Sequence, residues 1–290
     1  TLDTSDSQKV SKDDDKYDKK NNNVEEKKNK IDKIWEKINF ESIEIRKKEP
    51  ILNCFIDKKI SNHNSLQECI SYLVADNLKC SFIELREIKK ITDFALDSDK
   101  KIISSTLEDI LANFDRDPAC TRHINPILYY KGFQALQCYR VANFYSKKGE
   151  LDLAYFIQML VSNKFSVDIH PFATIGKGIL MDHAHGIVIG ETAKIGDNVS
   201  LLHSVTLGGT GKEEGDRHPK IGNGVLLGAG AKVLGNIKIG DCAKVASGSV
   251  VLTDVPERKT VAGIPAKIVG EIPKEILPSK SMNHEIITSG

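Results

Sequence analysis

An aliphatic residue recurs every six positions between residues 175 and 251, and this period constrains the fold more than any other feature of the chain. The series, interrupted twice, is Ile175, Met181, Ile189, Ile195, Leu201, Leu207, Ile221, Leu227, Val233, Ile239, Val245 and Val251. Glycine follows seven of these twelve residues. A period of six matches neither an α-helix nor the alternation of a half-buried strand, whereas it is typical of a solenoid of short strands and tight turns. The sequence therefore predicts a β-solenoid in which three hexads close one coil.

Composition divides the 290 residues into four segments. Residues 1–30 carry eight Lys and eight Asp or Glu with only three aliphatic residues, which predicts a disordered, charge-balanced tail. Residues 31–165 have apolar positions three and four apart and therefore predict an α-helical domain. The solenoid occupies 166–270, and 271–290 form a C-terminal tail. The expected fold class is α+β, a helical domain followed by a parallel β-helix.

Charge, hydropathy and cysteine spacing exclude several classes of protein. The formal net charge is +1, so no global field favours nucleic acid. No apolar stretch approaches the roughly 20 residues of a membrane helix. The six cysteines form no CxxC pair or zinc-ribbon spacing, which suits reduced thiols in a cytosol. We expect a cytoplasmic protein with no membrane or nucleic-acid partner.

The first interruption of the period places Asp182 and His183 directly after an aliphatic position. Asp168 precedes His183 by 15 residues, nearly one coil, which favours stacking of the two side chains. A carboxylate beside an imidazole orients a general base and stabilises its protonated form. The residue types alone leave a structural histidine as an equal alternative.

The second interruption is a longer, glycine-rich segment at residues 208–220 that contains Arg217 and His218. A guanidinium such as that of Arg217 can hold a carboxylate bidentately, and a glycine backbone can approach an acyl-thioester chain closely. A mobile charged loop is the alternative.

From residue 117 to residue 270 the chain resembles serine O-acetyltransferases of the hexapeptide-repeat class. The motifs that carry this resemblance include Asp117-Pro118-Ala119, Asp168-Ile169-His170-Pro171, Asp182-His183-Ala184 and Gly215-Asp216-Arg217-His218-Pro219-Lys220. The resemblance implies a left-handed β-helix, a homotrimer that can pair into a hexamer, and sites between adjacent prisms. It also implies acetyl transfer from acetyl-CoA to L-serine, the first step of cysteine biosynthesis, without a metal.

The same resemblance assigns roles to individual residues. His183 is expected to be the general base and Asp168 to orient it. Asp117 and Asp182 are expected to bind the substrate ammonium and Arg217 its carboxylate, with His218 beside the reacting side chain. Gly209, Ala229 and Ser247 are expected along the pantetheine, and Lys267 at the nucleotide phosphates.

Two partners follow from the resemblance. L-Cysteine is isosteric with serine, so we expect it to inhibit by competing for the same pocket. In the family a C-terminal isoleucine tail often docks into O-acetylserine sulfhydrylase; the printed sequence ends Thr288-Ser289-Gly290, so we do not expect that complex here.

Three alternatives remain open at this point. The first is an acyltransferase with another acceptor, such as a sugar or an antibiotic, although Arg217 speaks for an amino acid. The second is a zinc hydratase on a similar solenoid, for which the candidate ligands are His183, His185, His203 and His218. The third is a catalytically silent scaffold.

Overall fold

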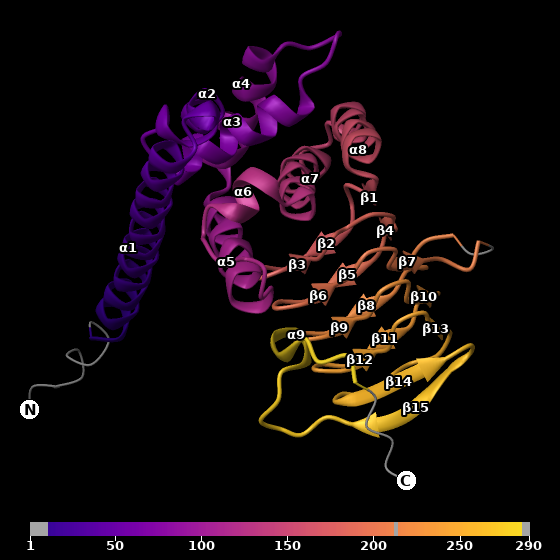
Figure 1. The fold of residues 1–290 in the computed structure, drawn as a ribbon. Helices are drawn as coiled ribbons and strands as arrows, with labels where there is room; N and C mark the ends of the chain where they lie inside the picture. Colours follow the sequence, from indigo (N-terminus) through magenta and orange to yellow (C-terminus); the bar gives the residue numbers. More distant parts are fainter. Residues whose placement is uncertain (1–10, 212–213, 286–290) are drawn as a thin grey trace, which may run out of the picture.

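The computed structural model describes residues 11–211 and 214–285. It confirms the predicted fold class: a helical region precedes a solenoid of parallel strands (Figure 1). The helices before the solenoid are α1 (Ser11–Lys48), α2 (Asn53–Ile56), α3 (Leu66–Leu78), α4 (Leu85–Ser98), α5 (Lys100–Arg116), α6 (Asn125–Tyr129), α7 (Lys131–Lys147) and α8 (Leu151–Phe165), with a 3-10 turn at Pro50–Leu52 and a π-helical turn at Asp57–Ser61.

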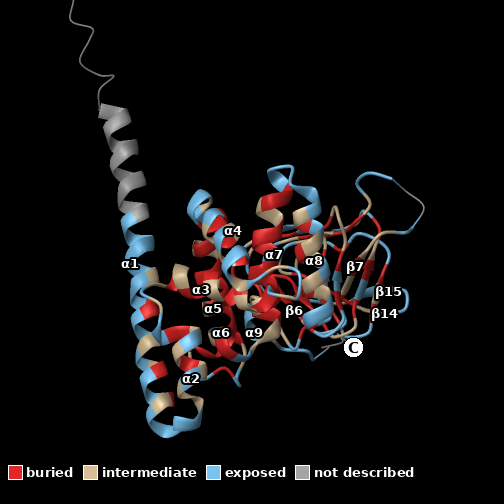
Figure 2. Cartoon of the chain, turned by 90° about the horizontal axis from the view of Figure 1, so that it is seen from above, coloured by how far each residue is buried: buried red, intermediate tan, exposed pale blue. Residues whose placement is uncertain are grey.

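Helix α1 begins inside the segment that was predicted to be disordered. Residues 1–10 of that segment lie outside the described residues, whereas 11–30 are helical. The C-terminal half of α1 buries Ile34, Ile38 and Ile45 (Figure 2). Extending an existing helix adds one hydrogen bond for each residue fixed, while starting one is costly, and we attribute the helical state of the charged segment to this extension. Residues 286–290, on which the docking expectation rested, also lie outside the described residues.

The solenoid consists of three parallel sheets that form the faces of a prism. Sheet A contains β1 (Val167–Ile169), β4 (Ile187–Ile189), β7 (Thr206–Gly208), β10 (Lys232–Leu234) and β13 (Val250–Val251). Sheet B contains β2 (Thr174–Ile175), β5 (Lys194–Ile195), β8 (Lys220–Ile221) and β11 (Lys238–Ile239). Sheet C contains β3 (Leu180–Met181), β6 (Ser200–Leu201), β9 (Leu226–Leu227), β12 (Lys244–Val245), β14 (Lys259–Gly263) and β15 (Ala266–Glu271), of which only the β14–β15 pair is antiparallel.

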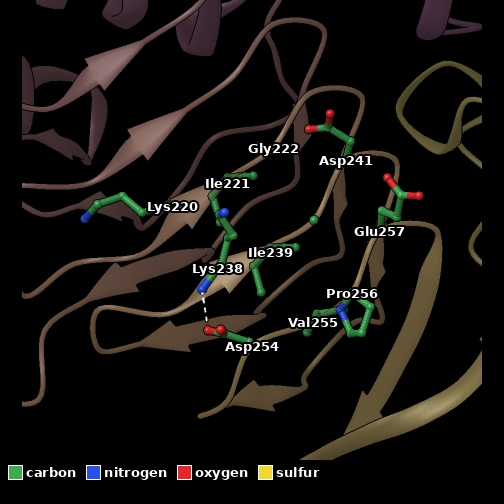
Figure 3. A pocket seen from close by; sticks show the side chains of 11 residues that line it. Lys220, Ile221, Gly222, Lys238, Ile239, Asp241, Asp254, Val255, Pro256 and Glu257 are labelled. Carbon is green, nitrogen blue, oxygen red and sulfur yellow. Dashed lines mark hydrogen bonds between the residues drawn. The ribbon is translucent and has the colours of Figure 1, made fainter.

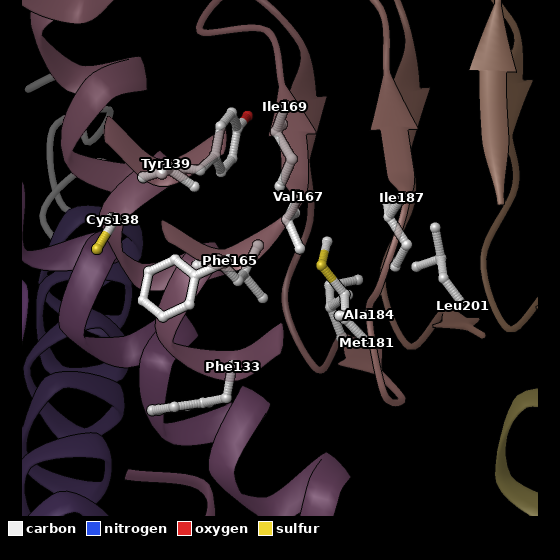
Figure 4. Close-up of a cluster of buried hydrophobic side chains, with 14 of the residues drawn as sticks. Phe133, Cys138, Tyr139, Phe165, Val167, Ile169, Met181, Ala184, Ile187 and Leu201 are labelled. Atoms are coloured by element: carbon white, nitrogen blue, oxygen red, sulfur yellow. The ribbon is translucent and has the colours of Figure 1, made fainter. Parts of the chain in front are cut away.

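The aliphatic positions of the hexad fill the centre of this prism. Eleven of the twelve are buried, and the twelfth, Ile175, is partly buried against the same core. The core continues into the helical region, where Phe133 and Phe165 lie near Val167 and Met181 of the first coil (Figure 4). After β15 the chain turns back to the short helix α9 (Pro278–Ser281), which packs against α5.

A buried ion pair fastens the helical region to the first coil. Asp109 of α5 is fully buried, and its Oδ2 accepts a hydrogen bond from Arg140 Nη2 of α7 over 2.7 Å. Its Oδ1 accepts from the backbone N–H of Ile179, and Arg140 Nη2 also donates to the carbonyl oxygen of Gly176. Two helices and one turn of the solenoid therefore share a single carboxylate.

Arg140→Met should lower the free energy of unfolding by about 3 kcal/mol or more, because it leaves the Asp109 carboxylate buried without its cation. Urea denaturation at fixed protein concentration measures this. Lys100→Met is the matched control, since Lys100 pairs with Asp97 on the surface and its loss should change little. Equal effects of the two substitutions would contradict the assignment.

Candidate active site

Successive coils turn from sheet C to sheet A at one edge of the prism, which we call the C–A corner. Backbone hydrogen bonds run along this edge from coil to coil; for example, Gly230 N donates to the His203 carbonyl oxygen over 2.9 Å. Side chains at equivalent positions of the turns are therefore stacked. The turns of the C–A corner are residues 182–186, 202–205, 228–231 and 246–249.

His183 lies in the first turn of this corner in a strained backbone conformation. Its φ is +56° and that of Ala184 is +59°, in the left-handed region that residues other than glycine seldom occupy. The imidazole is 71% exposed, and its ring stands edge-on to that of His203, with 5.8 Å between the ring centroids. The first turn thus presents an accessible imidazole at a fixed place.

Asp182 and His183 line a cleft of about 490 Å³ between the C–A corner and the helical region. Asp117 enters the same cleft from the end of α5, and Tyr130 from the start of α7. Asp182 Oδ2 lies 3.7 Å from His183 Nε2. The structure therefore brings together three predicted site residues, Asp117, Asp182 and His183, which we call the first group.

Tyr130 is a further polar residue of this cleft. Burial raises the pKa of its hydroxyl above the ordinary value, and the neighbouring Cys120 and Asp117 add to the effect. The hydroxyl consequently stays protonated at neutral pH and can donate a hydrogen bond. Tyr130 belongs to the motif at the start of α7, but its position beside Asp117 has no local signal in the sequence.

Gly132 allows α7 to approach the turn that carries His183. A β-carbon at Gly132 would overlap the carbonyl oxygen of Met181 and would lie 2.9 Å from Cβ of Ala184. A larger residue would push the helix away from the corner, so the shape of the cleft requires glycine at this position.

Arg217 and His218 lie at the other edge of sheet A, where the chain turns to sheet B. Thr192 Oγ1 accepts the backbone N–H groups of Arg217 and His218 over 3.0 and 3.1 Å. Arg217 Nη2 donates to Glu191 Oε2 over 2.7 Å. The sequence analysis missed Glu191 and Thr192, because nothing in the hexad distinguishes them from other turn residues.

The His218 ring is buried and has a defined tautomer. The backbone N–H of Thr192 donates to His218 Nδ1 over 3.2 Å, so the neutral ring carries its proton on Nε2. The ring lies against Gly190, where a β-carbon would overlap it. Burial lowers the pKa of His218 below its ordinary value, and the charge of Arg217 lowers it further.

Asp168 lies in the middle of sheet A, apart from the first group. It was expected to stack on His183, but the register places Val188 opposite Asp168, because the first coil contains 20 residues rather than 15. Asp168 Oδ1 accepts from Gln158 Nε2 over 2.7 Å, and no hydrogen bond joins it to His183 among the described residues. Asp168 acts instead on His170, as do Glu191 and Arg217. We therefore place Asp168 with Arg217 and His218 in a second group.

The residues predicted to bind the co-substrate fall at three places. Ala229 and Ser247 lie in successive turns of the C–A corner, farther along the edge from His183 and His203. Lys267 is exposed on β15. Gly209 lies instead beside Arg217, at the other edge of sheet A.

A separate cavity of about 560 Å³ lies on sheet B, where Lys238 N donates to Asp254 Oδ1 over 2.8 Å (Figure 3). None of the predicted site residues lines it. In the part of the chain that the structure describes, no group of three or more His, Cys, Asp or Glu residues could hold a metal ion. Within the same residues, no helix combines the length and apolar character needed to cross a bilayer.

Family models match both regions of the chain. The model described as "Serine acetyltransferase, N-terminal" matches residues 34–138, and the bacterial transferase hexapeptide model, with six repeats, matches 218–253. A serine acetyltransferase of Salmonella typhimurium is 48% identical over 250 residues, which are 86% of this chain and 91% of that protein.

Solved structures of serine acetyltransferases with bound ligands are similar over most of the chain. One in complex with cysteine has a TM-score of 0.86 and 45% identity, covering 88% of this chain and 99% of that one. One from Brucella abortus, in complex with coenzyme A, has a TM-score of 0.83 and 46% identity, with coverages of 84% and 98%. The soybean enzyme complexed with serine has a TM-score of 0.81 and 47% identity, with coverages of 83% and 99%.

Arg217→Gln should raise the pKa of His218 toward its ordinary value, because it removes a neighbouring positive charge while the burial of the ring remains. NMR titration of the imidazole signals measures the shift. Lys177→Gln removes an equal charge that has no effect on His218 and serves as the control. An unchanged or lower pKa in Arg217→Gln would contradict the electrostatic account.

Proposed function

This chain belongs to the serine acetyltransferase family, and from this we propose how its residues transfer the acetyl group of acetyl-CoA to the hydroxyl of L-serine. The chain is an acyltransferase that uses acetyl-CoA as co-substrate. The observation that carries the proposed mechanism is the cleft that holds Asp117, Asp182 and His183 together.

The two groups of residues match the two charges of an amino acid. Asp117 and Asp182 present two carboxylates that would bind the ammonium of serine, and Tyr130 stays neutral beside them. Arg217, held by Glu191, would exchange this partner for the carboxylate of serine. Sugars carry neither charge, which favours an amino acid as the acceptor.

One copy of the chain cannot apply both groups to the same serine. Strand β4 (Ile187–Ile189) lies between the turn of His183 and that of Thr192, a separation of about 10 Å at roughly 3.3 Å per residue. Serine carries its ammonium and carboxylate on one carbon. We therefore infer that the second group of one copy completes the first group of its neighbour.

Such a contact joins two different surfaces of the same chain and so closes into a ring. The three-faced prism suits a homotrimer, with one site at each junction. In this arrangement Asp168 of the neighbouring copy would approach His183 together with Arg217 and His218. Asp168 would then orient the imidazole across the junction rather than from an adjacent coil.

The reaction needs one proton acceptor and no covalent enzyme intermediate. His183 takes the proton of the serine hydroxyl as the oxygen attacks the thioester carbon. A backbone N–H of residues 208–210 would stabilise the resulting oxyanion. When the carbon–sulfur bond breaks, the imidazolium returns the proton to the sulfur of coenzyme A, and O-acetyl-L-serine is released.

The C–A corner offers a path for acetyl-CoA. Ala229 and Ser247 continue the edge of the prism that begins with His183, so an extended pantetheine along this edge would present its thioester to the base. Lys267 would bind the nucleotide phosphates. Gly209 would take part from the neighbouring copy, beside Arg217.

L-Cysteine differs from serine only by sulfur in place of oxygen, so the same charges would bind it. We infer that it inhibits by occupying the serine pocket, in line with the cysteine complex of a similar enzyme. Added serine should relieve this inhibition in a thiol-release assay. The six cysteines are free, which supports a reducing compartment such as the cytosol.

His183→Ala should lower kcat by about 10²- to 10⁴-fold, since it removes the general base. Release of the coenzyme A thiol, measured with acetyl-CoA and a panel of L-serine, other amino acids and sugars, tests both the base and the acceptor. Serine should be the preferred acceptor. A turnover unaffected by His183→Ala, or a preferred acceptor without an α-carboxylate, would overturn the proposal.

Mixing two inactive variants tests whether the site is shared between copies. His183→Ala and Arg217→Ala chains, co-expressed with separate affinity tags, should regain activity, because about a quarter of the junctions in random trimers combine an intact His183 with an intact Arg217. Trimers of either variant alone are the controls. No recovery in mixed trimers would place both residues in a site within one copy.

A further inference from the structure

Arg116 is a buried cation without a carboxylate partner. It is the last residue of α5, only 5% exposed, and it forms no ion pair among the described residues. Burial lowers the pKa of its guanidinium to about 10, which leaves it charged at neutral pH. Its Nε is buried without a hydrogen-bond partner. An arrangement this costly calls for a role that an apolar residue would not perform.

The guanidinium reaches into the second coil of the solenoid. Nη1 donates to Ser200 Oγ over 3.1 Å and to the carbonyl oxygen of Val199 over 3.4 Å. Nη2 donates to Asn198 Oδ1 over 3.2 Å. The end of α5 is thereby fastened to β6 and the turn before it.

The same strand holds Asp182. The backbone N–H of Asp182 donates to the carbonyl oxygen of Leu201 over 2.8 Å, and Leu201 directly follows Ser200 in β6. Asp117 directly follows Arg116. Strand β6 therefore lies behind both carboxylates of the cleft, one held through Arg116 and the other through Leu201.

The C-terminal segment completes this arrangement. Ser200 Oγ accepts from Arg116 and donates to the carbonyl oxygen of Ser279 over 2.7 Å, and both serines are fully buried. Ser279 belongs to α9, so the hydroxyl that holds Arg116 is itself oriented by the returning end of the chain.

We propose that Arg116 is a positioning residue for serine: it fastens α5 to β6 and so fixes the separation of Asp117 and Asp182 that recognises the substrate ammonium. This proposal rests on the proposed function of the cleft. Arg116 acts only through Asp117 and does not touch the substrate.

The test compares serine and acetyl-CoA kinetics of Arg116→Lys, Arg116→Met and Ser200→Ala. Displacement of a binding group by about 1 Å can cost roughly 10²-fold, so Arg116→Met should raise the KM for serine by roughly 10- to 100-fold. Arg116→Lys should raise it less, because its ammonium keeps the charge but cannot reach all three acceptors. The kcat and the KM for acetyl-CoA should change little. Ser200→Ala, which keeps the arginine, covers the case in which Arg116→Met fails to fold.

Ser71→Ala is the matched control for Ser200→Ala. Ser71 is equally buried and donates to Asp93 in the helical region, away from the cleft. Its loss should leave the KM for serine unchanged. Equal increases for Ser71→Ala and Ser200→Ala would overturn the proposal in favour of a general loss of packing.

Asp117→Asn separates failure of this proposal from failure of the proposed function. If Arg116 acts through Asp117, Arg116→Lys should raise the KM for serine in the unaltered chain and add little in the Asp117→Asn background. An additive effect, or no effect of Arg116→Lys and Ser200→Ala while Asp117→Asn raises the KM, would overturn the positioning role alone. An unchanged KM in Asp117→Asn would instead remove the ammonium site itself and the positioning role with it.

Discussion

Parallel backbone hydrogen bonds between successive coils determine where the functional side chains of the solenoid lie. Each coil repeats the path of the one before, so a residue's place on a face or edge follows from its position in the turn. The pairing of Met181 with Leu201 places His203 next to His183, and the same register leads along the edge to Ala229 and Ser247. Since the register allows little adjustment, chemistry is confined to turns and to inserted loops.

The helical region supplies what the prism alone lacks. A regular edge offers side chains in a single line, whereas an amino acid must be bound from more than one direction. Helices α5 and α7 add the opposite wall of the cleft, and the buried Asp109–Arg140 pair holds them on the first coil. The close approach at Gly132 then places this wall against the turn of His183. The helical region is therefore part of the active site as well as a cover for the first coil.

The sequence was sufficient for everything that repeats. The hexad predicted the core positions, and its two interruptions predicted the places where polar residues gather. It was insufficient where the length of a coil departs from the usual value: the first coil has 20 residues, so Asp168 faces Val188 and not His183. Contacts such as Arg116 with Ser200 join residues far apart in the chain and leave no local pattern. The helical state of residues 11–30 follows from their continuity with a packed helix and could not be read from their composition.

The left-handed backbone at His183 limits how this site can be lost over evolutionary time. Asparagine, aspartate and glycine adopt such a conformation readily, whereas β-branched residues do so only with considerable strain. A descendant that kept the solenoid but abandoned catalysis would therefore tend to carry one of those three residues in place of the imidazole. Inactive copies of this fold should thus be recognisable from one position, and a valine or isoleucine there would signal that the turn itself has been rebuilt.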